Sequence, residues 1–282
     1  MLLFNFSFYN RNNGKKYYFS KINILRHETL YKSYFSPSAI RTTYDVLKSN
    51  GTYHKTKKRN LSMYMYGSTC TASQFPQYYK DGKHHTLPRP YESSKPGHSG
   101  HRLMHCAWFT ELVSTIEDAV KFFLEELHPN KEFSEKILET MREVENIVPN
   151  ELRISNSIFT HLTVLGDLKD GSGMLPHLDE KDIITAIFHV GFPSEGGSTN
   201  YYNGLSVPDN GKKVKEVLFK HGRLQIGQYN NVIHGVDAWK GERGCLIFNT
   251  KETILNHFRE ESDYYYKQYQ RNGFPSGPFL AI

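Results

Sequence analysis

Residues 182–190 read Asp-Ile-Ile-Thr-Ala-Ile-Phe-His-Val, and this β-branched, apolar stretch predicts a buried strand. Similar short segments lie on both sides of it and are separated by turn signals such as Gly196-Gly197 and Lys240-Gly241. Many short strands with evenly spaced turns are typical of a sandwich or barrel. The segments predicted as strands are 157–165, 182–190, 213–220, 223–228, 231–236 and 243–249.

Amphipathic helices are predicted on both sides of this run of strands. Apolar residues recur at intervals of three and four from Trp108 to Leu127, and again from Phe133 to Val148. We expect these two helices to support a sheet, and we expect a last helix from about Lys251 to Gln270. Helices followed by a run of strands indicate an α+β protein.

The first 100 residues differ in composition from the rest. Residues 1–60 contain twelve Lys and Arg but two acidic residues, a net charge of +10, whereas residues 61–282 carry 23 basic and 27 acidic residues, a net charge of −4. No helical or strand period persists through residues 1–60, and the four prolines within 61–100 predict little regular structure there. We therefore divide the chain into a basic, loop-rich extension (1–100) and a folded domain (101–282). The extension is a solvated, loosely ordered segment, an arm that contacts nucleic acid, or an organelle-targeting segment.

Composition excludes several classes of protein. No stretch approaches the roughly 18 consecutive apolar residues that a membrane-spanning helix needs, so we expect no membrane partner. Three scattered cysteines do not form a disulfide framework, and the opening residues lack the basic flank of a secretory signal. We expect an intracellular protein of the cytoplasm or nucleus, with an organelle as the alternative that the basic N-terminus leaves open. The sequence does not predict an oligomeric state.

The segment Gly173-Met-Leu-Pro-His-Leu-Asp179 contains the residues that indicate chemistry. His177 and Asp179 are two positions apart, so on a strand both side chains point to the same side. His234, in the strand-like segment 231–236, is a candidate third ligand, because two His and one carboxylate form the facial triad of non-haem Fe(II) oxygenases. A lone His234 would fit equally well as a buried histidine bonded to a backbone carbonyl.

Arg243 precedes the apolar strand segment 244–248, nine residues after His234. A cation that leads into the interior of a barrel is costly to bury unless it is paired. A dicarboxylate co-substrate would supply a partner through a two-pronged hydrogen bond. The alternative is that Arg243 pairs with Glu242 or meets solvent at a strand edge.

These four residues together resemble the pattern of Fe(II)- and 2-oxoglutarate-dependent oxygenases, and their spacing is nearest to that of prolyl hydroxylase-like members. The resemblance covers roughly residues 154–250, and Gly196-Gly197 is similar to a Gly-Gly turn of that family. It implies a double-stranded β-helix, or jelly roll, braced by N-terminal helices. The sequence departs from that branch on the strand before the first ligand, where the usual Tyr that reaches the co-substrate is replaced by His161 and Thr163.

The resemblance also implies an activity and a set of site residues. His177, Asp179 and His234 would bind Fe(II) and act as catalytic residues, and Arg243, with Thr163, would bind 2-oxoglutarate. The implied reaction hydroxylates a substrate while 2-oxoglutarate is converted to succinate and carbon dioxide, with ascorbate as an optional reductant.

The substrate implied is a macromolecule, and the sequence leaves open whether it is a protein side chain or a nucleic-acid base. Residues 193–213 are either a substrate lid or a plain surface loop. The alternative function is a non-catalytic jelly-roll module that binds a metal or nucleic acid.

Overall fold

The computed structural model describes residues 5–9, 16–19, 37–55, 62–69, 77–80, 83–128, 130–166, 168–179, 181–202, 212–230 and 232–259. The chain divides into two compact units. The first comprises residues 1–65 and 162–249, and the second comprises residues 66–161 and 250–282. The two units reflect how the chain packs, and they do not test where a domain begins. The predicted domain boundary at residue 100 therefore stays a prediction.

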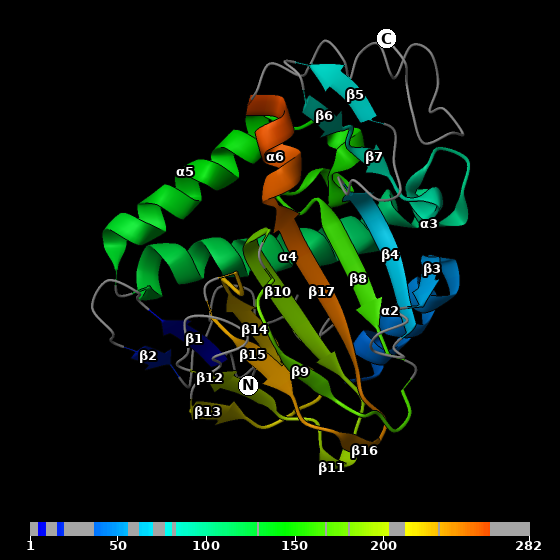
Figure 1. The fold of residues 1–282 in the computed structure, drawn as a ribbon. Helices are drawn as coiled ribbons and strands as arrows, with labels where there is room; N and C mark the ends of the chain where they lie inside the picture. The colour runs from blue at the N-terminus through cyan, green and yellow to red at the C-terminus, as the bar shows by residue number, and fades with distance from the viewer. Residues whose placement is uncertain are drawn as a thin grey trace. The chain divides into compact units, whose positions relative to one another are not determined.

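A large sheet runs through the first unit (Figure 1). β1 is parallel to β14, whereas the β1–β2, β10–β14 and β3–β4 pairs are antiparallel. In spatial order its strands are β2 (Lys16–Phe19), β1 (Asn5–Tyr9), β14 (Leu224–Gly227), β10 (Asp182–Val190), β17 (Gly244–Lys251), β8 (His161–Leu165), β4 (Ser62–Thr69) and β3 (Thr52–Lys55).

A smaller, four-stranded antiparallel sheet belongs to the same unit. Its order is β13 (Lys213–Val217), β12 (Thr199–Tyr202), β15 (His234–Val236) and β9 (Met174–His177), and a separate ribbon pairs β11 (Pro193–Gly196) with β16 (Trp239–Gly241). From β8 onward the chain moves repeatedly between the large and the small sheet. β8, β10, β14 and β17 lie in the large sheet, and β9, β12, β13 and β15 lie in the small one.

Apolar side chains from the two sheets pack against each other. Ile187 of β10 contacts a buried cluster of Tyr201, Val217 and Tyr229. It also contacts a second cluster, which contains Leu165, Trp239 and Cys245 and is flanked by Met174, Val236 and Ile247. Because side chains alternate along a strand, Thr185 and His189 face the small sheet together with Ile187.

A helix within the predicted basic extension packs on the large sheet. α2 (Pro37–Asn50) buries Ile40, Tyr44 and Leu47, which lie on one face at spacings of four and three. The expectation that no helical period persists through residues 1–60 is therefore wrong at this segment, where the three apolar residues are diluted by polar ones. The expectation that no strand period persists there is also wrong, at β1, β2 and β3. Residues 1–4, 10–15, 20–36 and 56–60 lie outside the described residues.

The Tyr44 hydroxyl is part of this packing, and the Tyr44→Phe variant is expected to lower the free energy of unfolding by about 1–3 kcal/mol. The buried hydroxyl lies 2.7 Å from the Gly166 carbonyl oxygen, to which it donates a hydrogen bond. Phenylalanine keeps the ring but removes that donor. Urea denaturation measures the change, with Tyr53→Phe at an exposed tyrosine as the matched control. Equal stability of the two variants would contradict the role given to Tyr44.

The second unit contains the predicted amphipathic helices, which are confirmed. They are α4 (Ala107–Phe122), continued by a π-helical turn η3 (Phe123–Leu127), and α5 (Lys131–Ile147), whose first turn is capped by the Asn130 side chain. The prediction that they support a sheet concerns the placement of the two units and stays a prediction. The other helices are α3 (Ser99–Met104), α6 (Glu252–Arg259) and the 3-10 turns η2 (Glu92–Ser94), η4 (Asn150–Leu152) and η5 (Ile154–Asn156).

The expectation of little regular structure over 61–100 is wrong in part. β4 lies there, β5 (Gln77–Lys80) and β6 (Lys83–Thr86) form a hairpin, and β7 (Arg89–Pro90) pairs with the end of β4. None of the helices in the described part of the chain is both long and apolar enough to cross a membrane.

The strand predictions hold best where the apolar run is longest. β10 has the bounds predicted from residues 182–190, and the mixed α+β class is confirmed. The prediction for 157–165 is wrong over its first four residues, because Asn156 adopts a positive φ and the Ser157 hydroxyl donates to the Ile154 carbonyl. The predicted last helix ends at Arg259 in the described residues, and the remainder of 251–270 lies outside them.

Candidate metal centre

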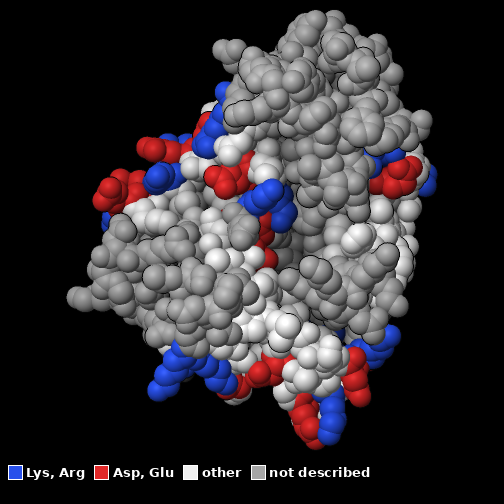
Figure 2. Space-filling view, in the orientation of Figure 1, with Lys and Arg blue, Asp and Glu red and all other residues white. Residues whose placement is uncertain are grey.

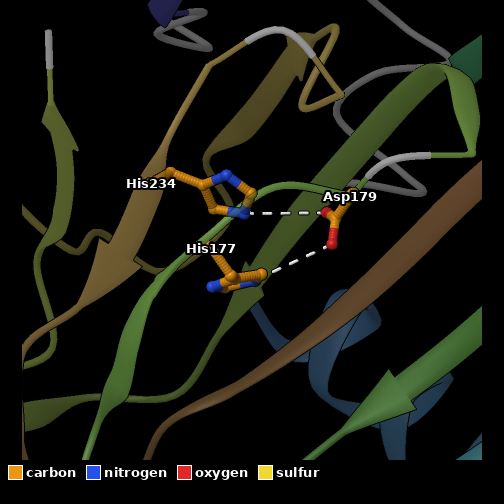
Figure 3. A group of neighbouring side chains, drawn as sticks. All are labelled: His177, Asp179 and His234. Atoms are coloured by element: carbon orange, nitrogen blue, oxygen red, sulfur yellow. Dashed lines mark ion pairs between the residues drawn. The ribbon is translucent and has the colours of Figure 1, made fainter. Parts of the chain in front are cut away.

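Two neighbouring strands of the small sheet place His177 and His234 opposite each other. β15 and β9 pair antiparallel with His234 in register with His177, and the register shifts immediately afterwards, before Val236. Side chains that face each other across an antiparallel pair lie on the same side of the sheet. The two imidazole rings have centroids 4.3 Å apart, and Figure 3 shows both beside Asp179.

Asp179 reaches the two imidazoles from just beyond the end of β9. Its backbone N–H donates to the Tyr229 carbonyl at 3.0 Å, and its own carbonyl accepts from the Asp182 N–H at 3.1 Å. These bonds hold the turn in which the carboxylate sits. One carboxylate oxygen lies 3.7 Å from His177 Nε2 and the other lies 3.6 Å from His234 Nε2 (Figure 3).

Backbone carbonyls fix which nitrogen of each imidazole carries the proton. His177 Nδ1 lies 2.8 Å from the Leu175 carbonyl oxygen, and His234 Nδ1 lies 3.0 Å from the Val232 carbonyl oxygen. A carbonyl can only accept, so each Nδ1 is the donor and each Nε2 keeps its lone pair for a metal. His234 is therefore bonded to a backbone carbonyl, as the alternative interpretation held, and still offers Nε2 as a ligand.

The three side chains fit a divalent first-row metal ion. Their ligand atoms lie within 4.8 Å of one another, and no second such group of His, Cys, Asp or Glu occurs among the residues that the structure describes. An ion with ligands at about 2.1 Å would bring neighbouring ligand atoms to about 3 Å, a small contraction from the distances here. His234 is buried while Asp179 is about one-third exposed, so the carboxylate side stays open. Two imidazoles and one carboxylate with an open side are the donor set of non-haem Fe(II) sites.

Two tyrosines that the sequence did not assign to the site surround His234. The Tyr229 ring packs edge-on against the His234 ring at 4.6 Å, and its hydroxyl lies 3.2 Å from the Tyr201 hydroxyl. Burial raises the pKa of Tyr229 well above its usual value, so this phenol is neutral. Tyr201 lies in register with His234 on β12 and is buried, so the lid or surface-loop prediction for 193–213 is wrong at Thr199–Tyr202. Residues 203–211 lie outside the described residues.

Arg243 is buried immediately before the start of β17, with 3% of its surface exposed. Its Nε donates to the Gly197 carbonyl at 3.0 Å, and its guanidinium carbon lies 4.9 Å from the Trp239 ring centroid. Gly197 makes room for this side chain, because a Cβ there would lie 3.0 Å from Arg243 Cδ.

The alternative interpretation of Arg243 as a partner of Glu242 is wrong. Glu242 instead accepts a hydrogen bond from the Arg41 guanidinium at 2.6 Å. Among the described residues, no carboxylate forms an ion pair with Arg243. A buried guanidinium without a counter-ion is costly, so this position favours an anionic ligand.

Thr163 lies on β8 of the large sheet with its side chain buried, and it is not part of the metal-ligand group. Its predicted contact with 2-oxoglutarate stays a prediction, as do the catalytic roles of His177, Asp179 and His234. His161 belongs to the second unit, where burial lowers its pKa to about 3.

Solved structures similar to this chain include two that are named as oxygenases. An oxidoreductase of the 2OG-Fe(II) oxygenase family from Burkholderia pseudomallei is 12% identical, with 75% of this chain and 78% of that chain covered and a TM-score of 0.41. NgTET1, solved in complex with 5mC DNA, is 10% identical, with 82% and 75% covered and a TM-score of 0.48. YcfD, a ribosomal oxygenase from Escherichia coli solved with cobalt and 2-oxoglutarate, is 10% identical, with 88% and 53% covered and a TM-score of 0.35.

These structures belong to the 2OG-Fe(II) oxygenase superfamily, which the sequence motif resembles. No family model and no curated protein matches the sequence. The residues of the site itself therefore carry the functional interpretation.

Proposed function

We propose that this chain is an Fe(II)- and 2-oxoglutarate-dependent dioxygenase that hydroxylates a macromolecule. One observation carries the proposal. His177 and His234 face each other across β9 and β15, both have Nδ1 bonded to a backbone carbonyl, and both direct Nε2 at the Asp179 carboxylate. Two histidines that serve packing alone would not need to direct their Nε2 atoms at the same carboxylate. Metal ligands do need this arrangement, because the free nitrogen of each imidazole must point at the ion.

The strand order supports the finer proposal that the core is a double-stranded β-helix. Eight strands from β8 to β17, leaving out the β11–β16 ribbon, divide equally between the two sheets, and the chain crosses repeatedly between them. Such crossing is the connectivity of a jelly roll. In that arrangement the inward faces of both sheets would enclose the site, and Arg243, next to β17 of the large sheet, would share this interior with the ligands of the small sheet.

The chain's own residues would orient the reactants and keep water out. Bound Fe(II) with 2-oxoglutarate would supply the oxidising chemistry, coupled to release of succinate and carbon dioxide. His177, Asp179 and His234 would hold the metal on one face and leave the opposite positions open. Arg243 would bind the distal carboxylate of 2-oxoglutarate, and Tyr229 and Tyr201 would shield the buried side of His234.

Conversion of 2-oxoglutarate to succinate tests this proposal against the non-catalytic module. The protein is incubated with Fe(II), 2-oxoglutarate, ascorbate and oxygen, with and without peptide and nucleic-acid pools, and succinate is quantified. We expect Fe(II)-dependent succinate that a chelator abolishes. Succinate at the level of a protein-free blank under every condition would favour the module instead.

The substrate class is tested by the salt dependence of binding. If a nucleic acid is the substrate, Lys and Arg residues among the twelve of residues 1–60 should contact phosphates, and raising salt from 50 to 200 mM should weaken binding by about a thousandfold or more for six such contacts. Elsewhere, Figure 2 shows basic and acidic side chains intermixed on the described surface of one face. A shallow salt dependence, measured by fluorescence anisotropy with a labelled single strand, would favour a protein substrate. The predicted intracellular location of the protein stays a prediction.

A further inference from the structure

His189 and Gln225 are polar residues buried in the interior between the two sheets. Each has 2% of its surface exposed. His189 lies on β10 two positions after Ile187, and Gln225 lies on β14 in register with Ile187. Both side chains therefore share the face of Ile187, which packs against the cluster around Tyr201.

Neither side chain has a hydrogen-bond partner of good geometry in the described structure. Both ring nitrogens of His189 and both amide atoms of Gln225 are buried and lack a hydrogen bond of ordinary geometry, although the two side chains lie close enough for Gln225 to act on the pKa of His189. A buried polar atom without a partner is unfavourable, and most native proteins contain few. Four such atoms on adjacent strands indicate a site shaped for a polar ligand.

Arg243 belongs to the same group of side chains. The Phe219 ring lies edge-on to His189 at 4.9 Å and 5.2 Å from the Arg243 guanidinium carbon. Burial first, and then the charge of Arg243, lower the pKa of His189 to about 3, and the neighbouring Gln225 side chain acts in the opposite direction. The imidazole is thus neutral at neutral pH, and one of its two nitrogens carries a proton that it can donate.

We propose that His189 and Gln225, together with Arg243, hold the distal carboxylate of 2-oxoglutarate. The inference rests on the proposed function. The guanidinium next to the start of β17, the imidazole N–H on β10 and the amide NH₂ on β14 supply donors from the region of three adjacent strands, and a carboxylate offers about four acceptor positions.

Binding of two keto acids distinguishes a role of His189 and Gln225 in carboxylate binding from a structural role. 2-Oxoglutarate has the distal carboxylate, and 2-oxobutyrate lacks it while keeping the metal-chelating end. Dissociation constants are measured anaerobically on the Fe(II)-loaded protein from the metal-to-ligand absorption band. We expect His189→Phe and Gln225→Met each to weaken 2-oxoglutarate binding by about tenfold or more, and to change 2-oxobutyrate binding less than twofold.

The matched control is His54→Phe at an exposed histidine, which should change neither constant. Equal weakening of both keto acids by His189→Phe and Gln225→Met, or no weakening of either, would overturn the inference. Absence of the band in the unaltered protein would overturn the proposed function itself, so the two failures are distinguishable.

Thermal denaturation without metal or keto acid gives a second readout. Gln225→Met removes two unpaired buried polar atoms at similar volume, so its melting temperature should equal or exceed that of the unaltered protein. A large fall in melting temperature would show that Gln225 has a structural partner and would contradict the inference.

Discussion

The His177→Ala variant is expected to bind Fe(II) at least a hundredfold more weakly than the unaltered protein and to lose turnover. Removing His177 leaves one imidazole and one carboxylate, and loss of groups that merely support metal ligands already costs ten- to a hundredfold. The fold should persist, because the Leu175 carbonyl that loses its donor belongs to a residue with 86% of its surface exposed. Calorimetric titration with Fe(II) under anaerobic conditions measures the affinity.

His54→Ala is the control for this variant, since His54 is an exposed histidine of the same unit. It should bind Fe(II) as the unaltered protein does. Undiminished Fe(II) affinity in His177→Ala, with coupled activity intact, would refute the assignment of His177 as a ligand.

The Arg243→Met variant is expected to lose 2-oxoglutarate affinity by two orders of magnitude or more while it keeps Fe(II) binding. A bidentate guanidinium–carboxylate pair contributes two charge-assisted hydrogen bonds, each of about 1.5–3 kcal/mol. Methionine retains the apolar stem that packs against Trp239 and removes the charge. Arg243→Lys should be intermediate, because lysine keeps a charge but lacks the planar fork.

Arg142→Met, at an exposed arginine of the second unit, is the matched control and should leave both affinities unchanged. Retained 2-oxoglutarate affinity in Arg243→Met would mean that another cation receives the co-substrate. The buried Arg243 guanidinium would then bind an anion other than 2-oxoglutarate.

The metal-ligand group was predictable from the sequence because its residues sit at strand ends with recognisable spacing. His177 and Asp179 are separated by one residue, and His234 lies in an apolar segment that reads as a strand. Their convergence depends on the β9–β15 register, which no local pattern in either segment determines.

The surroundings of the site were less predictable. Tyr229 follows the end of β14 and has no periodic signal, yet its ring packs on His234. His189 and Gln225 read as ordinary residues of apolar strands, and only the structure shows that both are buried and unpaired. Thr199–Tyr202 was obscured by polar neighbours, because a strand inside a polar stretch has little apolar alternation to reveal it.

Helix α2 illustrates the opposite error, in which a signal was present but diluted. Ile40, Tyr44 and Leu47 have helical spacing, but the basic composition of residues 1–60 favoured an unstructured arm. The burial of these residues depends on the large sheet, which is assembled from strands far away in the sequence.

Anaerobic addition of Fe(II) and 2-oxoglutarate to the purified protein shows whether His177, Asp179 and His234 form a metal site. A ferrous ion held by His177, Asp179 and His234 and chelated by the keto acid should give a visible metal-to-ligand absorption band. We expect the band to form at a stoichiometry of one and to be lost in His177→Ala. A band of full intensity in that variant, or no band in the unaltered protein at saturating Fe(II), would contradict this expectation.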